Sequence, residues 1–339
     1  MDKRIKVFIT SCETAPDAWR GQEEKLVALY EQSNKKYALI NDPEEADIIL
    51  IGDLRGGNWG EKIINQPLIR KYPEKSFSLS HEDRPIMLHH GFYTSNEYSI
   101  MRWNRARTGA YNLYPDKYKN PYIPKKIDTK EHLNPKKEYL FSFIGRNSHP
   151  CRELIYQQKF SREDILIEDS SAFDLWKNPS DKEQRQEYYV NMLLASKFSL
   201  CPRGYATNII RLFESMELGI APVIISDAFI YPKGPDWKSF SIKVKEKHIG
   251  DLESIISSFE ENYKEMGVKA RSEFMKWFSD PDYFNYVVEN CLDIKKHQII
   301  PESLYWKINP IYIFFLKLRI NERVNYYAKK FINILSTKT

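Results

Sequence analysis

The sequence is short of the features that mark secreted, zinc-binding and membrane-spanning proteins. Its four cysteines, Cys12, Cys151, Cys201 and Cys291, are widely scattered and form no CxxC pair. A disulfide framework or a zinc site is therefore not expected. No uncharged apolar run reaches the roughly 18 residues of a spanning helix. The opening MDKRIKVFITSC has no apolar region followed by a cleavage site, so we expect no signal peptide and a cytoplasmic location.

The charge is also nearly balanced. Lys and Arg number 51 against 46 Asp and Glu, a net charge of +5, which gives no reason to expect a nucleic-acid partner. Aromatic residues make up 14% of the chain. Rings stack on sugar faces and on bases, so this excess fits a carbohydrate or nucleotide binder, although most rings in any protein fill the core. The length of 339 residues is typical of two domains.

Apolar runs alternate with helical patterns along the chain. Residues 5–10, 46–52 and 84–90 are strand-like, and residues 23–32 have helical periodicity. Continuous apolar strands separated by helices indicate a parallel sheet covered on both faces. The alternation resumes after residue 138, with strand-like runs at residues 139–144, 197–201, 221–226 and 240–244. The pattern predicts an α/β protein with two lobes.

A proline-rich stretch separates the two halves. Pro115, Pro121, Pro124 and Pro135 are interleaved with lysines, which is typical of an interdomain linker. We therefore expect an N-terminal domain over residues 1–130, a C-terminal domain over residues 131–290 and a C-terminal helical segment over residues 291–339.

The most informative stretch is residues 197–237. A strand ends at Cys201, a turn contains Arg203 and Gly204, and Thr207 or Asn208 is placed to cap the next helix. In open α/β sheets, ligands bind beyond the carboxyl ends of strands, where helix N-termini present N–H groups to anions. Gly204 would let the backbone approach a phosphate, and Arg203 could bind that phosphate through two hydrogen bonds. The turn therefore predicts a diphosphate site.

The helix after this turn carries a charged pair. Arg211 and Glu214 are three residues apart and so share a helix face. The carboxylate suits ribose hydroxyls and the guanidinium suits a phosphate. The alternative is an ordinary ion pair on a solvated face. The position of the pair, after the turn and before Gly219, favours a ligand-binding role.

The order of these residues resembles the C-terminal motif of the exostosin family, glycosyltransferase family 47. The matching residues are Cys201-Pro202-Arg203-Gly204, Arg211, Glu214, Gly219, Pro222-Val223-Ile224, Ser226-Asp227, Pro232, Asp236-Trp237, Phe240-Ser241 and Val244, with YLFSFIGR and Arg152-Glu153-Leu154 upstream. The resemblance implies a GT-B architecture, in which two Rossmann-like domains face each other across a cleft. The N-terminal domain would bind the acceptor and the C-terminal domain the nucleotide sugar.

The resemblance also implies a reaction. The expected activity is inverting transfer from a UDP-sugar-type donor to a glycan or lipid-linked glycan acceptor in surface polysaccharide synthesis, without a metal or other cofactor. The donor-binding residues implied are Gly145, Arg146, Arg203, Gly204, Asn208, Arg211 and Glu214. The N-terminal half departs from the family, because its GRDH-like signature is not recognisable here.

The general base has to be sought in that divergent half. Histidine suits proton transfer near neutral pH, and the candidates are His81, Glu82, Asp83, His89 and His90, with Glu13 and Asp53 after the first two strands. Each could instead be a surface group or a satisfied core residue. Two acidic pairs could suggest a metal site, but neither is predicted to bind metal. The pair in residues 280–282 is predicted to lie in a turn, and the pair in residues 251–253 is predicted to begin a helix. Arg146, Arg203 and Arg211 would neutralise the leaving group.

The tail from Ile311 to Leu335 mixes aromatic and basic residues. Such a helix can lie in a membrane interface, here at the inner membrane face. The alternative is a final helix that crosses back to pack on the N-terminal lobe, although residues 278–294 could make that crossing instead.

Two other functions compete with a transferase. One is a non-catalytic glycan or sugar-nucleotide binding subunit that assists a partner transferase. The other is an unrelated two-lobed enzyme such as an epimerase or dehydrogenase. The latter would have a GxGxxG after the first strand, and TSCETAPDAWRG contains none.

Overall fold

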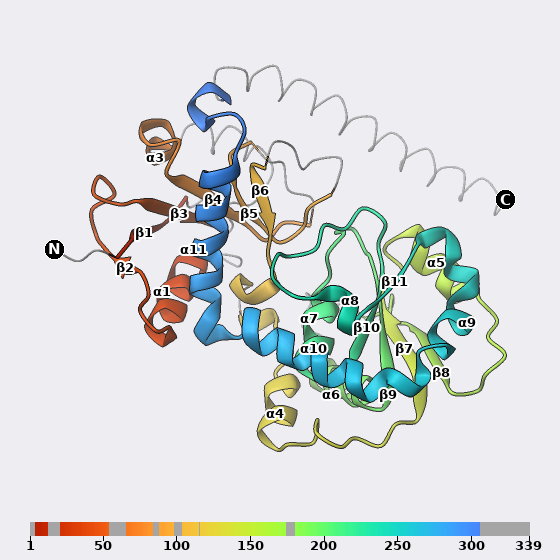
Figure 1. Ribbon diagram of the computed structural model, residues 1–339. Coiled ribbons are helices and arrows are strands. Elements are labelled where there is room, and N and C mark those ends of the chain that lie inside the picture. Colours follow the sequence, from red (N-terminus) through yellow and green to blue (C-terminus); the bar gives the residue numbers. More distant parts are fainter. Residues whose placement is uncertain are drawn as a thin grey trace.

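The computed structural model describes residues 4–12, 21–53, 66–83, 88–97, 104–114, 116–173 and 180–305. Two parallel sheets organise these residues (Figure 1). The first sheet has six strands in the order β2-β1-β3-β4-β5-β6. Their bounds are β1 (Lys6–Ser11), β2 (Ala38–Leu39), β3 (Ile48–Gly52), β4 (Ser76–Ser80), β5 (Gly91–Tyr93) and β6 (Ala106–Thr108). Every residue of β3 is buried, as expected of a strand covered on both faces.

The second sheet has five parallel strands in the order β11-β10-β9-β7-β8. The strands are β7 (Tyr139–Gly145), β8 (Ile165–Asp169), β9 (Ser196–Pro202), β10 (Ala221–Ile225) and β11 (Ile242–Val244). The helices of this lobe are α5 (Pro150–Gln157), α6 (Lys182–Leu194), α7 (Ile210–Glu217), α8 (Trp237–Phe240), α9 (Leu252–Ser257) and α10 (Tyr263–Trp277), with the 3-10 helices η5 (Glu246–Asp251) and η6 (Glu260–Asn262).

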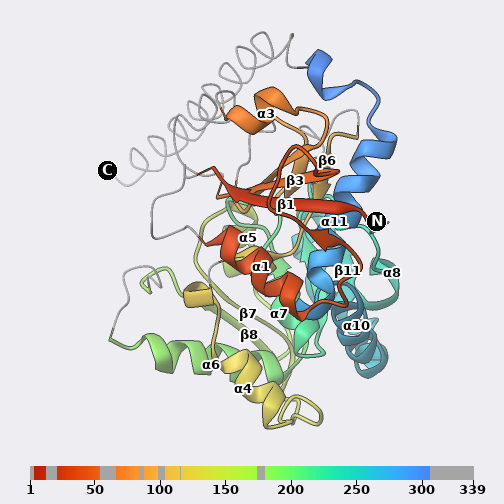
Figure 2. The same ribbon diagram turned by 90° about the vertical axis from the view of Figure 1, so that its left-hand side faces the viewer.

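The chain between the sheets is structured. It forms the short helices η2 (Tyr111–Leu113), η3 (Asp116–Tyr118) and α4 (Tyr122–Asp128). Figure 2 shows α4 beside α6, and the two helices are in contact. The segment that joins the lobes is thus anchored on the second lobe.

A C-terminal helix returns to the first lobe. In Figure 1, α11 (Asp280–His297) runs from the end of α10 to the first sheet, where it packs on α1 (Gln22–Gln32) and β5. A short helix, α3 (Pro67–Lys71), covers another part of this sheet. One apolar cluster extends from Val7 and Phe92 through Tyr283 to Phe213 and Phe274. The two lobes therefore share part of their core, and residues 278–294 largely form the crossing helix.

One strand prediction was wrong in placement. Residues 84–87 lie outside the described part of the chain, and residues 88–90 are bends between β4 and β5. The imidazoles of His89 and His90 hydrogen-bond to Ser78 and Ser76 in β4. The acidic triplet at residues 280–282 opens α11 and does not form a separate turn.

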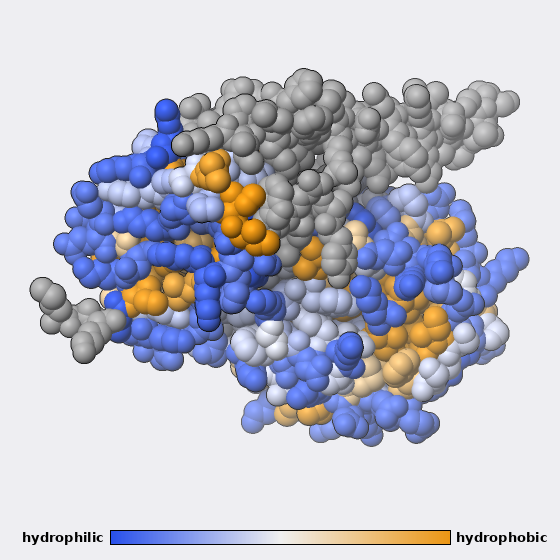
Figure 3. All heavy atoms as spheres, turned by 45° about the horizontal axis from the view of Figure 1, so that its top comes forward, coloured by the Kyte–Doolittle hydropathy of each residue, from blue (hydrophilic) through white to orange (hydrophobic). Residues whose placement is uncertain are grey.

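The surface is mostly polar on the face shown in Figure 3, with apolar residues gathered in small separate areas on both lobes. Among the described residues, no helix combines the length and the apolarity needed to cross a bilayer. The tail from Ile311 to Leu335 lies outside these residues.

Candidate active site

A pocket of about 580 Å³ opens where β7 and β8 end and α7 begins. We call it the β7–α7 pocket. Ligand sites in open α/β sheets lie at this edge, beyond the carboxyl ends of the strands. Its lining residues are Tyr118, Asn120, Ile144, Gly145, Arg146, Asn147, Ser148, Arg152, Glu168, Ser170, Ser171, Phe173, Arg185, Gln186, Tyr188, Tyr189, Tyr205, Ile209, Ile210, Arg211 and Glu214.

Arg211 lies against the wall of the pocket formed by β7. Its Nη2 donates to the carbonyl of Ile144, and its Nε lies 3.3 Å from the Tyr189 hydroxyl. The guanidinium carbon is 4.6 Å from the centre of the Phe143 ring. These contacts orient the guanidinium through a carbonyl, a phenol and a ring face, none of which cancels its charge.

Glu214 lies one turn further along α7. The Tyr189 hydroxyl donates to its Oε2 at 2.7 Å. Burial raises the pKa of Glu214, against the opposing effects of this hydrogen bond and of Arg211. Arg211 and Glu214, which the sequence predicts to share one face of the helix, are therefore linked through the phenol of Tyr189 on α6.

Arg152 is a second guanidinium in the pocket. It donates to the carbonyls of Arg203, Arg146 and Pro202 at 3.0, 2.9 and 3.1 Å, and so ties the loop after β7 to the turn after β9. Burial and the nearby Arg211 lower its pKa to about 10. Within the described part of the chain, neither Arg152 nor Arg211 forms an ion pair with a carboxylate.

The glycines of the predicted site are places of close approach. A Cβ on Gly145 would lie 2.8 Å from the Phe143 ring, and one on Gly204 would lie 2.9 Å from Ser148 Oγ and 3.1 Å from Arg152 Nη2. Gly204 thus lets the turn after β9 pack against the loop that contains the exposed Arg146.

Arg203 and Asn208 lie at the junction of the lobes, outside the lining of the pocket. Arg203 Nη2 is 3.3 Å from Glu97 Oε1, with both side chains largely buried. Asn208 Nδ2 donates to the carbonyls of Thr94 and Gly109 at 2.7 and 3.1 Å. The predicted helix cap was wrong. Ile209 precedes α7 without a side-chain cap, because Asn208 and Thr207 bond to the other lobe.

His81 lies at the carboxyl end of β4, the edge of the first sheet that carries the predicted base. Gln22 Oε1 accepts from the Asp53 N–H at 2.6 Å, so its Nε2 donates to His81 Nδ1 at 2.7 Å. A neutral His81 therefore has its proton on Nε2. Asp53 itself accepts from the N–H groups of Gly21 and Gln22 and so anchors the start of α1.

Glu82 and Asp83 follow His81 at the same edge, half-buried and exposed respectively. Asp83 is close enough to Tyr111 to add to the effect of burial, which raises the pKa of that phenol. Tyr111 in turn donates its hydroxyl to the carbonyl of Asn208 at 3.0 Å. These contacts place the Asp83 carboxylate near the junction with the second lobe.

His89 and His90 lie at the opposite edge. They precede β5 and are almost fully buried. His89 contacts Ser78 and the carbonyl of Pro73, while His90 contacts the carbonyl of Ser76 and Gln298. Burial lowers the pKa of His89 well below its usual value. Because the strands are all parallel, the amino ends lie opposite the carboxyl-end edge at which ligands bind. The burial of both side chains makes these histidines core residues. Glu13 lies outside the described residues.

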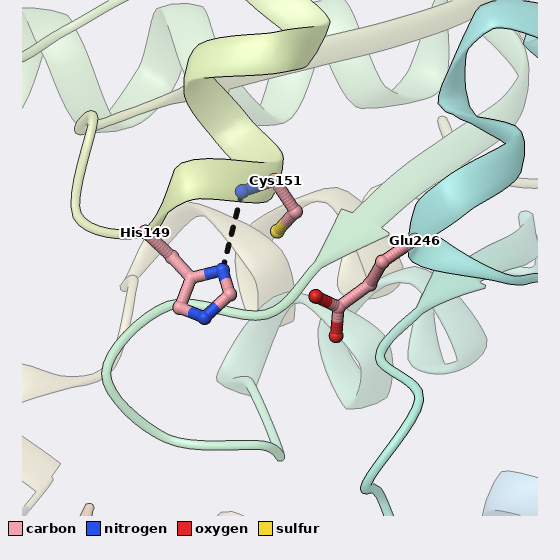
Figure 4. A group of neighbouring side chains, drawn as sticks. All are labelled: His149, Cys151 and Glu246. Atoms are coloured by element: carbon pink, nitrogen blue, oxygen red, sulfur yellow. Dashed lines mark hydrogen bonds between the residues drawn. The ribbon is translucent and has the colours of Figure 1, made fainter. Parts of the chain in front are cut away.

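Figure 4 shows a group whose composition could suit a metal, with His149, Cys151 and Glu246 presenting ligand atoms within 4.8 Å of one another. His149 Nδ1 accepts from the Cys151 N–H at 3.2 Å and caps α5. Burial, with Glu246 nearby, raises the pKa of the Cys151 thiol to about 12. The thiol donates to the carbonyl of Arg203. These internal contacts account for the group, and we assign no metal to it.

Each lobe is a parallel sheet covered by helices, so the described residues form the two Rossmann-like lobes that the sequence predicts. Residues 107–259 match the model of the Exostosin GT47 domain, and this match supports glycosyltransferase activity. The chain is 25% identical over 272 residues to an Exostosin-1 homolog of Caenorhabditis elegans, an alignment that covers 69% of this chain and 71% of that protein.

One further sequence likeness is narrower, and one structural likeness covers more of the chain at lower identity. A probable glucuronoxylan glucuronosyltransferase of Arabidopsis thaliana is 39% identical over 77 residues, which cover 22% of this chain and 17% of that protein. The crystal structure of an α1,3-fucosyltransferase has 15% identity and a TM-score of 0.39, over 86% of this chain and 89% of that chain.

Of the predicted donor residues, Gly145, Arg146, Arg211 and Glu214 line the pocket. Sequence reasoning did not include Arg152 or Tyr189 among the site residues. Arg152 is part of the family-like segment after YLFSFIGR and could have been found there. Tyr189 is 22 residues before Arg211 on another helix, and no signal in the sequence joins the two.

Proposed function

We propose that the chain is an inverting transferase that binds a UDP-sugar-type donor in the β7–α7 pocket. The acceptor would be a glycan or lipid-linked glycan in surface polysaccharide synthesis. The activity would be cytoplasmic, with membrane contact through the tail from Ile311 to Leu335 at the inner face. The single observation that supports the donor site is the pair Arg152 and Arg211, two guanidinium groups in one pocket that form no direct ion pair with a carboxylate of the described residues.

The two arginines favour an anionic ligand because it is costly to hold two cations together away from water. Each guanidinium is partly buried and is bonded mainly to backbone carbonyls. Burial of a charge without a counter-ion is costly, whereas a diphosphate supplies two negative charges and suits guanidinium geometry. The same groups would stabilise the charge that develops on the leaving nucleoside diphosphate. We therefore propose a metal-independent reaction, in which transfer persists in the presence of a chelator.

The remaining roles follow from position. Glu214 would accept hydrogen bonds from the ribose, and Gly145 and Arg146 would lie beside the phosphates. Arg203, Gly204 and Asn208 would shape the turn at the lobe junction that closes on the donor. Glu82 or Asp83 would act as the base at the facing edge of the first sheet. His81 would act indirectly, by holding Gln22 beside Asp53 at the same edge.

The test is a screen of thermal stabilisation with UDP, GDP, ADP and CDP and their sugar conjugates. A ligand that binds only the native state raises stability in proportion to ln(1 + [L]/Kd). We expect one nucleoside diphosphate to stabilise the protein and its sugar conjugate to be hydrolysed slowly without an acceptor. Binding without hydrolysis or transfer would favour the non-catalytic binding subunit. No stabilisation by any of these ligands would overturn the donor site.

A further inference from the structure

Tyr189 joins the two charged residues of α7 from a neighbouring helix. It lies on α6, lines the β7–α7 pocket, and is the hydrogen-bond partner of both Arg211 and Glu214. Arg211 Nε donates to the phenol oxygen at 3.3 Å, and the phenol donates its own proton to Glu214 Oε2 at 2.7 Å. A single hydroxyl thus fixes the orientation of a guanidinium and of a carboxylate.

The direction of these hydrogen bonds matters for the ligand. An Arg Nε can only donate, so the phenol has to accept from it and keeps its proton for Glu214. Burial, with Glu214 nearby, raises the pKa of Tyr189 well above its usual value, so the proton stays on the phenol at neutral pH. Of the two carboxylate oxygens, Oε2 takes the bond from Tyr189, which leaves Oε1 to accept from a donor on a ligand.

We propose that Tyr189 is a positioning residue for the ribose of the donor: its hydroxyl orients Glu214 so that the carboxylate can accept hydrogen bonds from the ribose diol. This inference rests on the proposed function, since it requires a ribonucleotide in the pocket. Tyr189 acts through Glu214. We expect its hydroxyl to increase the preference of the pocket for a ribonucleotide over a dideoxyribonucleotide.

The charge of Glu214 depends on few neighbours. The groups that face it are Tyr189 on α6, Cys201 on β9, Arg211 on its own helix, and Glu217, which is a turn further on. Lys119 and Arg271 face Glu217. Burial raises the pKa of Glu214, and the bond from Tyr189 opposes this rise. Without the phenol, Glu214 should hold its proton to higher pH, and a protonated carboxyl accepts less well from the ribose.

The experiment compares Tyr189→Phe with the wild type by titration calorimetry. The probes are whichever of UDP, GDP, ADP and CDP binds the wild type best, and the 2′,3′-dideoxy form of the same nucleotide. Loss of a hydrogen bond to a charged group should weaken binding of the ribonucleotide by about ten-fold or more, while the dideoxy form, which lacks the diol, should be weakened much less. Across a pH series, the acid-side loss of ribonucleotide affinity should move to higher pH in the variant.

The control is Tyr286→Phe, which removes a buried phenol bond of similar length, to the carbonyl of Lys233 at 2.8 Å, outside the pocket. It should leave both affinities unchanged. If Tyr189→Phe does not fold, Glu214→Gln gives the same test, because an amide cannot titrate and should abolish the acid-side loss. Equal weakening of both nucleotides, or an unchanged pH profile, would overturn the inference while leaving the donor site intact. No binding to the wild type would overturn the proposed function and the inference together.

Discussion

The charge of individual residues near the site depends on burial as much as on neighbouring charged groups. Glu217, one turn beyond Glu214, has its pKa raised to about 7 by burial and by Glu214, with smaller opposing effects of Lys119 and Arg271. The folded protein thus holds this proton more tightly than the unfolded chain, whose carboxyl has an ordinary pKa near 4.5. Stability should therefore fall as pH rises from about 4.5 to about 7.

Glu217→Gln should remove this penalty. At pH 8 the variant should be more stable than the wild type by roughly 1–2 kcal/mol, because the buried charge is gone. At pH 4 the two proteins should differ little, since Glu217 is then protonated. Urea unfolding at both pH values measures the difference. A variant that is less stable at pH 8 would show that the ionised carboxylate is stabilised by its cationic neighbours.

The sequence predicts only those site residues that are related by a short spacing or that end a recognisable strand. Arg211 and Glu214 share a face because they are three apart on one helix, and Gly145 follows a strand visible in the sequence. The contacts of Arg152 and Tyr189 depend on how α5 and α6 pack against other elements, which spacing does not encode. His89 and His90 were misplaced because the strand was assigned to residues 84–90, whereas β5 begins at Gly91.

At the scale of elements, α7 ends as its sequence predicts. Gly219 has φ +73, the left-handed backbone that suits glycine beyond a helix end. The packing of α10 on this turn was not predictable, because it depends on a distant glycine. A Cβ added to Gly267 in α10 would lie 2.3 Å from the carbonyl oxygen of Gly219.

Gly267→Ala should therefore destabilise the protein, although alanine is the better helix former by about 1 kcal/mol. The clash is with backbone, so α10 has to move away from α7, at a cost of roughly 1–3 kcal/mol. Gly250→Ala is the matched control, because the nearest atom to its added Cβ is at 4.0 Å. Thermal unfolding of both variants checks this. Equal or higher stability of Gly267→Ala would contradict the close approach of the two helices.

At the scale of the whole molecule, the chain beyond α11 closes the first lobe. Glu302 is fully buried and pairs with Arg105 of that lobe, and it also accepts from the His90 N–H. Burial opposes ionisation of Glu302, but His90, His89 and Arg105 outweigh it and hold its pKa at about 2. The lobe that sequence places at the N-terminus is thus completed by the C-terminal part of the described chain.

Glu302→Gln should destabilise the protein at pH 7 by about 3 kcal/mol or more, because Arg105 is left buried without its counter-charge. The depressed pKa adds stability above pH 4.5 that is lost as pH falls toward 2, and this acid-side loss should be smaller in the variant. Glu31→Gln, which breaks the exposed pair with Lys35, should change stability by less than about 1 kcal/mol. Urea unfolding from pH 2.5 to 7 tests both. Similar effects of the two substitutions would contradict a closing role for Glu302.

The two-lobed α/β architecture was predictable because buried parallel strands are continuous apolar runs. The core shared between the lobes was harder to predict from the sequence. Phe213, Phe274 and Tyr283 come from separate helices, and the sequence of each helix indicates only its own apolar face.

The most direct measurement is calorimetric titration of the best-binding nucleoside diphosphate into the wild type, Arg211→Gln and Arg162→Gln. Arg162 pairs with Asp164 and Glu260 away from the pocket, so its variant controls for the loss of one positive charge. If the β7–α7 pocket binds the diphosphate, Arg211→Gln should weaken binding by about ten-fold or more and Arg162→Gln should leave it unchanged. Equal affinity of Arg211→Gln and the wild type would contradict the account.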